Sequence, residues 1–357
     1  MGVGITINRW LYLLIKHRFA VDISRLPSVL LITFISILNT TIGCYEKAIF
    51  KKRVDETKLI APPLFIIGYW RTGTTLMHNL LSLDERFTYP TTYTCLFPNH
   101  FLLTENTLKR RLEGFLPQTR PMDNMQLSWD MPQEDEIALA LITGLSPYID
   151  FAFPQTPPTN HRFLDFREAT FKEIQIFKET LSHFVRKHTY RSHKRVVLKS
   201  PTHTYRIKLL ARIFPGSKFI HLVRDPITVY LSAIHTFKIQ RSLIGLKKPD
   251  NSLLELEVIK DMLLCYRNIR EIKESLTPDE FCEIRFEDLE KQPITEIEKI
   301  YSSLRLRGFE SVRSKLESYL ASITGYEKNV YDIPDWKRNQ LLRIFSPILE
   351  EYGYQNN

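Results

Sequence analysis

Residues 62–82 read PPLFIIGYWRTGTTLMHNLLS and carry the strongest indication of the fold in the sequence. An apolar run comes first, a loop from Gly68 to Gly73 follows, and a segment with helical patterning ends it. We therefore predict a buried strand, a tight loop and a helix, in that order. The loop matches the phosphate-loop pattern G-x-x-x-x-G-K-[ST], except that Thr74 stands where the lysine should be. Backbone N–H groups of such a loop and of the helix N-terminus hold a phosphate-like anion.

The missing lysine limits the class of ligand. In nucleotide triphosphatases this lysine reaches the β- and γ-phosphates, so its absence argues against triphosphate chemistry. A basic residue, Arg71, lies inside the loop instead. A ligand with one 5′-phosphate that carries one further small anionic group suits this loop better. A kinase or nucleotide triphosphatase of the P-loop type remains the alternative.

The same alternation of strand and helix recurs further along the chain. Residues 195–237 predict strand, helix, strand and helix, and residues 281–286 predict another strand. The strands are continuous apolar runs, as in sheets that are covered on both faces. We therefore expect an α/β fold with a P-loop-like, mainly parallel sheet flanked by helices. Residues 88–165 and 240–252 are interpreted as helical and loop insertions.

Two longer helices are predicted from apolar spacing. The first carries Phe171 and Leu181 on its apolar face. The second opens with a capping-box pattern, Ser252 with Glu255, and stops before Pro278.

A second anion site is predicted where the run FIHLVRDP ends. Arg224 follows a buried strand and so emerges at the carboxyl edge of the sheet, where α/β proteins bind ligands. Ser232 lies eight residues later, about two helical turns into the next helix and on nearly the same face. A planar arginine with a nearby hydroxyl suits a phosphate group.

Composition and charge narrow the function classes. The chain has 357 residues, of which 43% are hydrophobic and 25% charged, and this excludes a disordered, collagen-like or polytopic membrane protein. A net charge of +9 favours an anionic partner: nucleic acid, a phosphorylated small molecule or an anionic membrane surface. A non-enzymatic module that binds anions or membranes is therefore a second alternative. The four cysteines form no close pair, so we expect buried thiols and a reducing compartment.

The N-terminal residues 1–60 are expected to form a helical segment that precedes a domain over residues 61–357. Residues 26–45 contain no charged residue, and basic residues flank them. Three interpretations compete: a helix packed on the domain, an interfacial membrane helix, and a true span, for which the dense apolar part is short. We expect a cytoplasmic protein, with peripheral membrane contact through residues 26–45 as the second interpretation.

The motifs together identify the chain as resembling a family. RTGTT after an apolar strand, then LKSP, then FPGSKFIHLVRDP with a serine eight residues past the arginine, resembles the sulfotransferases that use 3′-phosphoadenosine-5′-phosphosulfate (PAPS). The resemblance extends over residues 62–354, since RFEDLEKQP at 285–293 and the later YEKNVYDIP also fit. It is closer to the tyrosylprotein-type and bacterial enzymes than to the cytosolic drug-metabolising ones, whose loop has lysine in place of Arg71.

The resemblance implies a role for each motif. The loop binds the 5′-phosphosulfate, Arg224 and Ser232 bind the 3′-phosphate, and Lys199 of LKSP assists sulfuryl transfer together with the loop arginine. Lys328 of YEKN is expected to close over the 3′-phosphate. The loop residues expected to bind PAPS are Arg71, Thr72, Gly73, Thr74, Thr75 and Leu76.

The catalytic base is where the sequence departs from the resemblance. The tyrosylprotein enzymes carry a glutamate about twenty residues past the loop arginine, whereas this chain has Tyr-Pro-Thr-Thr at 89–92. The acidic cluster at 134–136 is the best substitute, with Glu136 ahead of Glu134 and Asp135 third. Acids in a first helical turn also favour the helix dipole without any catalytic role. His203 and His78 are the rival bases, because imidazole accepts protons near neutral pH.

The acceptor is expected to be a hydroxyl compound, with a lean towards lipid-like or hydrophobic alcohols. This lean rests on the candidate membrane segment and on aromatic residues of the insertions that could line a channel or belong to the core: Phe97, Phe101, Tyr148, Phe151 and Phe153. PAPS is the expected co-substrate. Neither a metal nor a nucleic-acid partner is expected.

Overall fold

The computed structural model describes residues 2–122, 125–155, 158–323 and 331–354. Its contacts divide the chain into two compact units, each built from several stretches. The first unit comprises Met1–Pro62, Arg86–Leu198 and Lys238–Asn251, and the second comprises Pro63–Glu85, Lys199–Phe237 and Ser252–Asn357. The expected insertions at 88–165 and 240–252 lie almost wholly within the first unit. The predicted boundary between residues 60 and 61 remains a prediction.

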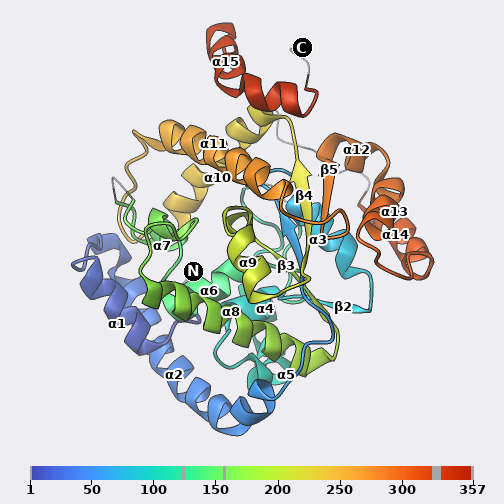
Figure 1. The fold of residues 1–357 in the computed structure, drawn as a ribbon. Helices are drawn as coiled ribbons and strands as arrows, with labels where there is room; N and C mark the ends of the chain where they lie inside the picture. Colours follow the sequence, from blue (N-terminus) through green and yellow to red (C-terminus); the bar gives the residue numbers. More distant parts are fainter. Residues whose placement is uncertain (1, 123–124, 156–157, 324–330, 355–357) are drawn as a thin grey trace. The chain divides into compact units, whose positions relative to one another are not determined.

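The second unit is organised around three parallel strands (Figure 1). Strand β1 (Leu64–Ile67) pairs with β4 (Lys218–Val223), and β4 pairs in turn with β5 (Phe281–Arg285). Every side chain of β1 is buried, as its continuous apolar run predicts. All three strands were predicted from the sequence, and their parallel pairing confirms the expected type of sheet.

Helices alternate with these strands and bury their apolar faces against them. The predicted second helix is confirmed as α11 (Leu254–Lys273), but its expected capping box is wrong: Leu253 is the N-cap, without a side-chain cap hydrogen bond. The helix begins one residue later than predicted, and its first residue, Leu254, is buried. The other helices of this unit are α3 (Thr74–Ser82), η4 (Pro201–Tyr205), α9 (Ile207–Ile213), most of α10 (Pro226–Ile244), α12 (Phe286–Lys291), α13 (Pro293–Ser303), α14 (Glu310–Ser322) and α15 (Asp335–Glu351).

The first unit is mainly helical. Its short strand β2 (Phe87–Thr88) pairs in parallel with β3 (Arg195–Lys199), whose last residue is assigned to the second unit. Parallel pairings in both units, joined by helices, confirm the α/β class. Its helices are α1 (Ile7–Lys16), η1 (Ile23–Arg25), α2 (Leu26–Asp55), α4 (Thr92–Leu96), α5 (Phe101–Arg111), η2 (Glu113–Phe115), α6 (Asp135–Thr143), α7 (Ile149–Ala152), η3 (His161–Phe163) and α8 (Phe171–Ser192).

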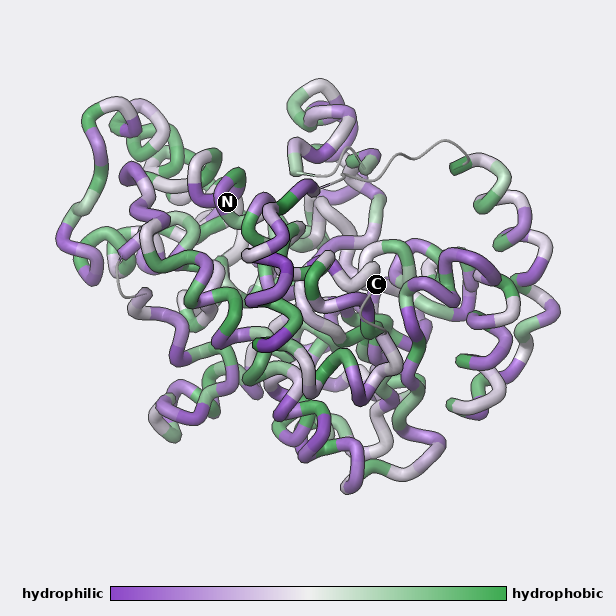
Figure 2. Tube along the Cα trace, turned by 90° about the horizontal axis from the view of Figure 1, so that it is seen from above, coloured by the Kyte–Doolittle hydropathy of each residue, from purple (hydrophilic) through white to green (hydrophobic). Residues whose placement is uncertain are grey.

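Helix α8 supplies much of the core of the first unit. Its start is fixed by a capping box in which the Thr170 hydroxyl accepts from the Glu173 N–H and the Glu173 carboxylate accepts from the Thr170 N–H. Hydrophobic and hydrophilic residues alternate along much of the trace, as expected for helices with one buried face (Figure 2). One core cluster joins Phe184 of α8 to Tyr93, Phe97, Phe101 and Trp129.

Helix α2 is helical throughout, as predicted for residues 26–45, but it is buried on an unexpected side. Its buried residues are Ser36, Asn39, Glu46 and Val54. Three of these four are polar, so α2 packs on its unit mainly through polar side chains. The thiol of Cys44 on the same helix is exposed, contrary to expectation, whereas the other three cysteines are buried and all four are free.

Candidate functional site

The glycine-bounded loop of the second unit connects β1 to α3 in a conformation that leaves backbone N–H groups available to an anion. Gly73, with φ of 94°, is the N-cap of α3, and no side chain caps the helix. Gly68 is held at the other end of the loop by Thr204, whose hydroxyl accepts from its N–H at 2.8 Å and donates to its C=O at 3.1 Å. The N-terminus of a nine-residue helix therefore faces the loop without a protein cap.

Inside the loop, Arg71 adopts a left-handed backbone conformation with φ of 72°. The hydroxyl of Thr72 donates to the C=O of Tyr69 at 2.8 Å, which closes the turn around Arg71. A non-glycine residue in this region costs about 1–2 kcal/mol, and such strain is typical of binding loops. The loop is thus held in a shape that its own residue types do not favour.

The two predicted anion-binding elements meet in the structure. Arg71 Nε donates to the hydroxyl of Ser232, on α10, at 3.0 Å. Arg224 follows β4 directly and donates through Nη1 to the C=O of Arg71 at 3.1 Å. Two guanidinium groups and a buried hydroxyl therefore gather beside the loop, all within the second unit. The sequence predicted each of these residues separately, and the structure brings them together.

Phe286, the first residue of α12, packs against both the arginine and the loop of this cluster. Its ring stacks under the Arg224 guanidinium, with the carbon Cζ 4.3 Å from the ring centroid. The same ring lies so close to Gly73 that a Cβ there would meet its Cδ2 at 2.1 Å. One side chain thus fixes both the arginine and the loop. No pattern in the sequence marks this residue as part of the site, although it follows β5 directly within the motif RFEDLEKQP.

Lys199 ends strand β3 and is almost completely buried, with 1% of its surface exposed. Its Nζ donates to the hydroxyl of Thr75, in the first turn of α3, at 3.5 Å. Lys199 therefore lies beside the first turn of α3, next to the loop, and its role in sulfuryl transfer remains a prediction. Thr74 is buried beside Thr75, and Leu76 is partly exposed on the next position of the helix.

The electrostatics of this site favour an anionic ligand. Burial lowers the pKa of Arg224 below its ordinary value, and nearby Glu287 opposes this while Arg71 reinforces it. A cation that is partly desolvated next to a second cation is stabilised when a phosphate or sulfate binds between them. The arrangement provides two such cations, a buried lysine and uncapped helical N–H groups.

The acidic cluster lies in the first unit, around the start of α6. Glu134 is its N-cap residue, and its carboxylate accepts a short hydrogen bond from the hydroxyl of Tyr148. Glu136 is fully buried and accepts from the hydroxyl of Ser146 at 2.6 Å. Asp135 is buried beside them. Sequence reasoning missed both hydroxyl partners, because they lie ten or more residues away; the catalytic role of either glutamate remains a prediction.

The two rival bases lie in the second unit. His78 is fully buried within α3, and His203 is fully buried in η4, where its ring contacts Phe65 of β1 edge-on. Lys328 lies outside the described residues. Tyr331, just beyond it, donates through its hydroxyl to Ser232 at 3.4 Å and joins the predicted 3′-phosphate site. Among the described residues, no group of three or more His, Cys, Asp or Glu side chains is placed to hold a metal ion.

The aromatic residues expected either to line a channel or to belong to the core take part in packing. Phe97 and Phe101 belong to the core cluster described above, and Phe153 is buried against Trp10 of α1. Tyr148 is buried while its hydroxyl contacts Glu134.

Comparison with known proteins agrees with this geometry. The sulfotransferase family model matches residues 62–311. A Mycobacterium tuberculosis protein named omega-hydroxy-beta-dihydromenaquinone-9 sulfotransferase Stf3 is 41% identical over all 357 residues, which cover 92% of its length; its Mycobacterium bovis counterpart matches equally. The crystal structure of sulfotransferase STF9 from Mycobacterium avium superposes with a TM-score of 0.70 at 16% identity, covering 98% of this chain and 97% of that one. Sulfotransferase STF1 from M. tuberculosis gives a TM-score of 0.63 at 13% identity, covering 96% and 92%.

The two solved structures share the fold at low sequence identity. The family match covers the loop with Arg71, the LKSP strand and the FIHLVRDP motif with Arg224. These findings set aside the kinase and the non-enzymatic alternatives. The expected resemblance is confirmed: this chain belongs to the sulfotransferase family and is a sulfotransferase.

Proposed function

We propose that the enzyme transfers the sulfuryl group of PAPS to the hydroxyl of a hydrophobic, lipid-like acceptor. The observation that carries the donor assignment is the cluster of Arg71, Ser232 and Arg224 beside an uncapped helix N-terminus. PAPS carries a 5′-phosphosulfate and a separate 3′-phosphate, and the site offers two adjacent sets of groups that bind anions. A simple monophosphate would use one of them only.

The proposed roles follow from the contacts. The loop N–H groups and Arg71 hold the 5′-phosphosulfate. Lys199, at the end of β3, donates to Thr75 and so lies beside the first turn of α3, the helix that follows the loop. Arg224 and Ser232 hold the 3′-phosphate. In sulfuryl transfer, an acceptor oxygen attacks sulfur in line with the bond to the 5′-phosphate oxygen, and that bond breaks. Cations near the bridging oxygen stabilise the negative charge that grows on the leaving phosphate.

The proton of the acceptor hydroxyl needs a base. We assign this role to the acidic cluster of α6, with Glu136 ahead of Glu134. The hydroxyl of Ser146 donates to the carboxylate of Glu136, and that of Tyr148 donates to the carboxylate of Glu134, so both carboxylates are held in fixed orientations. Glu136→Gln should lower kcat at least about 100-fold if it is the base. Glu179→Gln, which changes an exposed carboxylate of α8 in the same unit, is the matched control; equal losses in both variants would contradict the assignment.

The acceptor class is supported by the relative that is 41% identical along the whole chain, whose name specifies an omega-hydroxylated dihydromenaquinone. An acceptor panel tests it: an omega-hydroxylated menaquinone in detergent, a short primary alcohol and a tyrosine peptide, each with labelled PAPS. We expect transfer to the first to exceed the others at least about tenfold in kcat/KM. Preference for the peptide would refute the lipid-like class while leaving the donor assignment intact.

Donor binding is tested without any acceptor. Thermal stabilisation by 3′-phosphoadenosine 5′-phosphate (PAP) is compared with that by adenosine 5′-phosphate, for the wild type and for Arg224→Ala. We expect PAP at 100 times its dissociation constant to stabilise the wild type by about 2.7 kcal/mol and the variant far less. Arg343→Ala, which removes an exposed arginine of α15 in the same unit, is the matched control. Equal stabilisation by both nucleotides would refute the 3′-phosphate assignment.

A further inference from the structure

We propose that α1, η1 and α2 form a docking surface for an anionic membrane, with α2 lying in the plane of the interface rather than crossing the bilayer. We call the exposed side of these elements the apolar face. It consists of Ile15 of α1, Phe19 of the turn that follows, Ile23 of η1, and Leu30, Leu31 and Phe34 of α2, each at least 59% exposed. The proposal concerns how the enzyme binds lipid, and it goes beyond the assignment of donor and acceptor.

The apolar face arises because α2 is turned the opposite way from a helix on a soluble protein. Leu30, Leu31 and Phe34 share one side of the helix, with Leu38 one turn further, and all are exposed. Ser36 and Asn39 lie on the other side and are buried. A surface helix of a soluble domain buries its apolar stripe and exposes its polar one. Contiguous exposed apolar surface of this kind marks a site that meets another apolar phase.

The polar side of α2 is fastened to the first unit by specific hydrogen bonds. Asn39 Nδ2 donates to the C=O of Val3 at 2.6 Å and to that of Ile5 at 3.1 Å, and its Oδ1 lies 3.0 Å from His100 Nε2. Nearer the N-terminus of the helix, the indole N–H of Trp10 donates to the hydroxyl of Thr33 at 2.8 Å. These bonds fix the rotation of the helix, so it cannot turn its apolar side inward without breaking them.

An ion pair fastens the second half of α2. Lys187 of α8 contacts Glu46 at 2.5 Å, and both side chains are buried. Glu46 also accepts from the N–H of Leu103 at 3.1 Å. An unpaired carboxylate in a low-dielectric phase is strongly unfavourable, so α2 does not leave this contact to enter a bilayer. By length and composition the segment Ile23–Asp55 could cross a membrane. Its buried polar attachments favour a position along the surface instead.

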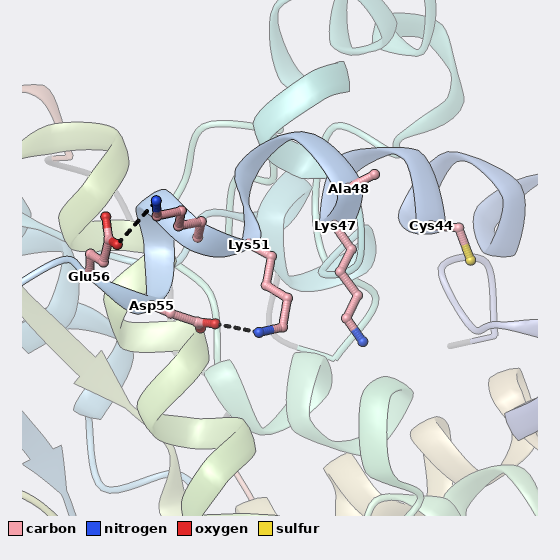
Figure 3. Close-up of a pocket in the computed structure, with 7 residues that line it drawn as sticks. Cys44, Lys47, Ala48, Lys51, Asp55 and Glu56 are labelled. Atoms are coloured by element: carbon pink, nitrogen blue, oxygen red, sulfur yellow. Dashed lines mark hydrogen bonds and ion pairs between the residues drawn. The ribbon is translucent and has the colours of Figure 1, made fainter.

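Charge complementarity identifies the occupant as an anionic membrane. No charged residue occurs from Leu26 to Tyr45, and exposed basic residues lie beyond both ends of this stretch. At the C-terminal end, Lys47 and Lys51 border a shallow depression on α2, and the side chain of Lys47 extends away from Asp55 and Glu56 (Figure 3). Lys51 pairs with Asp55 at 2.7 Å. Membrane binding increases with the apolar area that enters the interface, and Lys or Arg side chains near the surface add attraction to anionic lipids.

Vesicle binding of the full chain tests the proposal. The experiment compares flotation of the wild type and of Leu30→Gln/Phe34→Gln with vesicles of phosphatidylcholine that contain about 30% phosphatidylglycerol as the anionic lipid. Each large apolar side chain that leaves lipid forfeits about 1.5 kcal/mol, so the double variant should partition at least about 100-fold more weakly. The matched control is Phe115→Gln/Phe171→Gln, which changes two still more exposed side chains of the same unit outside the apolar face.

Further readouts separate the other occupants and the proposed function. Light scattering measures the oligomeric state; loss of a dimer in the Leu30→Gln/Phe34→Gln variant with unchanged flotation would overturn the proposal in favour of a second copy. Retention of the wild type on vesicles through alkaline carbonate would overturn the in-plane position in favour of a span. PAP binding measured on the same variants should be unchanged. A wild type that binds PAP but does not float with the vesicles refutes the docking surface alone. A wild type that floats but does not bind PAP refutes the donor assignment alone.

Discussion

The contact between Gly73 and Phe286 gives the sharpest prediction about the site. Gly73→Ala places a methyl group where the backbone has φ of 94° and where the nearest ring carbon lies 2.1 Å away. The left-handed backbone contributes about 1–2 kcal/mol of destabilisation. Overpacking against a buried ring contributes about 1–3 kcal/mol. Together they predict a loss of about 2–5 kcal/mol in the free energy of unfolding, measured by urea titration.

Two other glycines separate these contributions. Gly353 has φ of 66° but no atom within 4 Å of an added Cβ, so Gly353→Ala carries the backbone effect alone. Gly114 has neither a left-handed φ nor a neighbour within 4 Å, so Gly114→Ala should leave stability within about 1 kcal/mol of the wild type. The excess loss in Gly73→Ala over Gly353→Ala measures the clash with Phe286.

The same substitution should weaken donor binding. Relief of the clash moves either the loop or the Phe286 ring, and the ring supports Arg224. We expect the dissociation constant for PAP to rise at least about tenfold, which corresponds to about 1.4 kcal/mol. Phe286→Leu in the Gly73→Ala background should recover stability relative to the sum of the two single changes. A Gly73→Ala variant no less stable than Gly353→Ala, with unchanged PAP affinity, would refute the reasoning.

Three further predictions concern single side chains. Lys187→Met should lower the free energy of unfolding by about 3–5 kcal/mol in urea titrations, because Glu46 stays buried without its cation. The double variant Lys187→Met/Glu46→Leu should recover most of this loss. Equal losses in the single and the double variant would contradict the prediction. Burial lowers the pKa of His100 to about 4 from 6.5, so the free energy of unfolding is highest above pH 6.5 and falls as the pH drops towards 4. His100→Gln should remove about 3 kcal/mol of that fall, measured by urea titrations at pH 7 and pH 4. An unchanged pH dependence would contradict this prediction. Lys199→Met should reduce kcat about 100- to 1,000-fold in a transfer assay with little change in PAP affinity, and a wild-type kcat would exclude its role.

Much of the second unit could be predicted from sequence because its signals are local. Strand β1, the loop and α3 follow one another within 21 residues, and glycines mark both ends of the loop. Ser232 and Arg224 were placed correctly because a strand end and a helical turn fix their directions. Their contact with Arg71 spans about 150 residues of sequence, and only the parallel pairing of β1 with β4 brings them together.

The errors have physical causes that no local pattern reveals. The capping box at Ser252 was wrong by one position, since α11 begins at the buried Leu254 with Leu253 as its N-cap. The orientation of α2 was not predictable, since its apolar residues outnumber the polar ones on almost every side. Asn39 and Glu46 face inward because their distant partners, His100 and Lys187, satisfy them. The partners of the acidic cluster were missed for the same reason.

The left-handed conformation of Arg71 has a consequence for how variants of this enzyme would be selected. A glycine at this position would fit the backbone better, so a screen for thermal stability alone would enrich Arg71→Gly. Such a screen would discard the guanidinium that meets Ser232 and would return robust but inactive proteins. Selection for activity in the cell favours the arginine, even though a glycine would make the loop more stable. Improvement of this enzyme by directed evolution therefore needs turnover as the selected trait, with the loop excluded from any library built on stability.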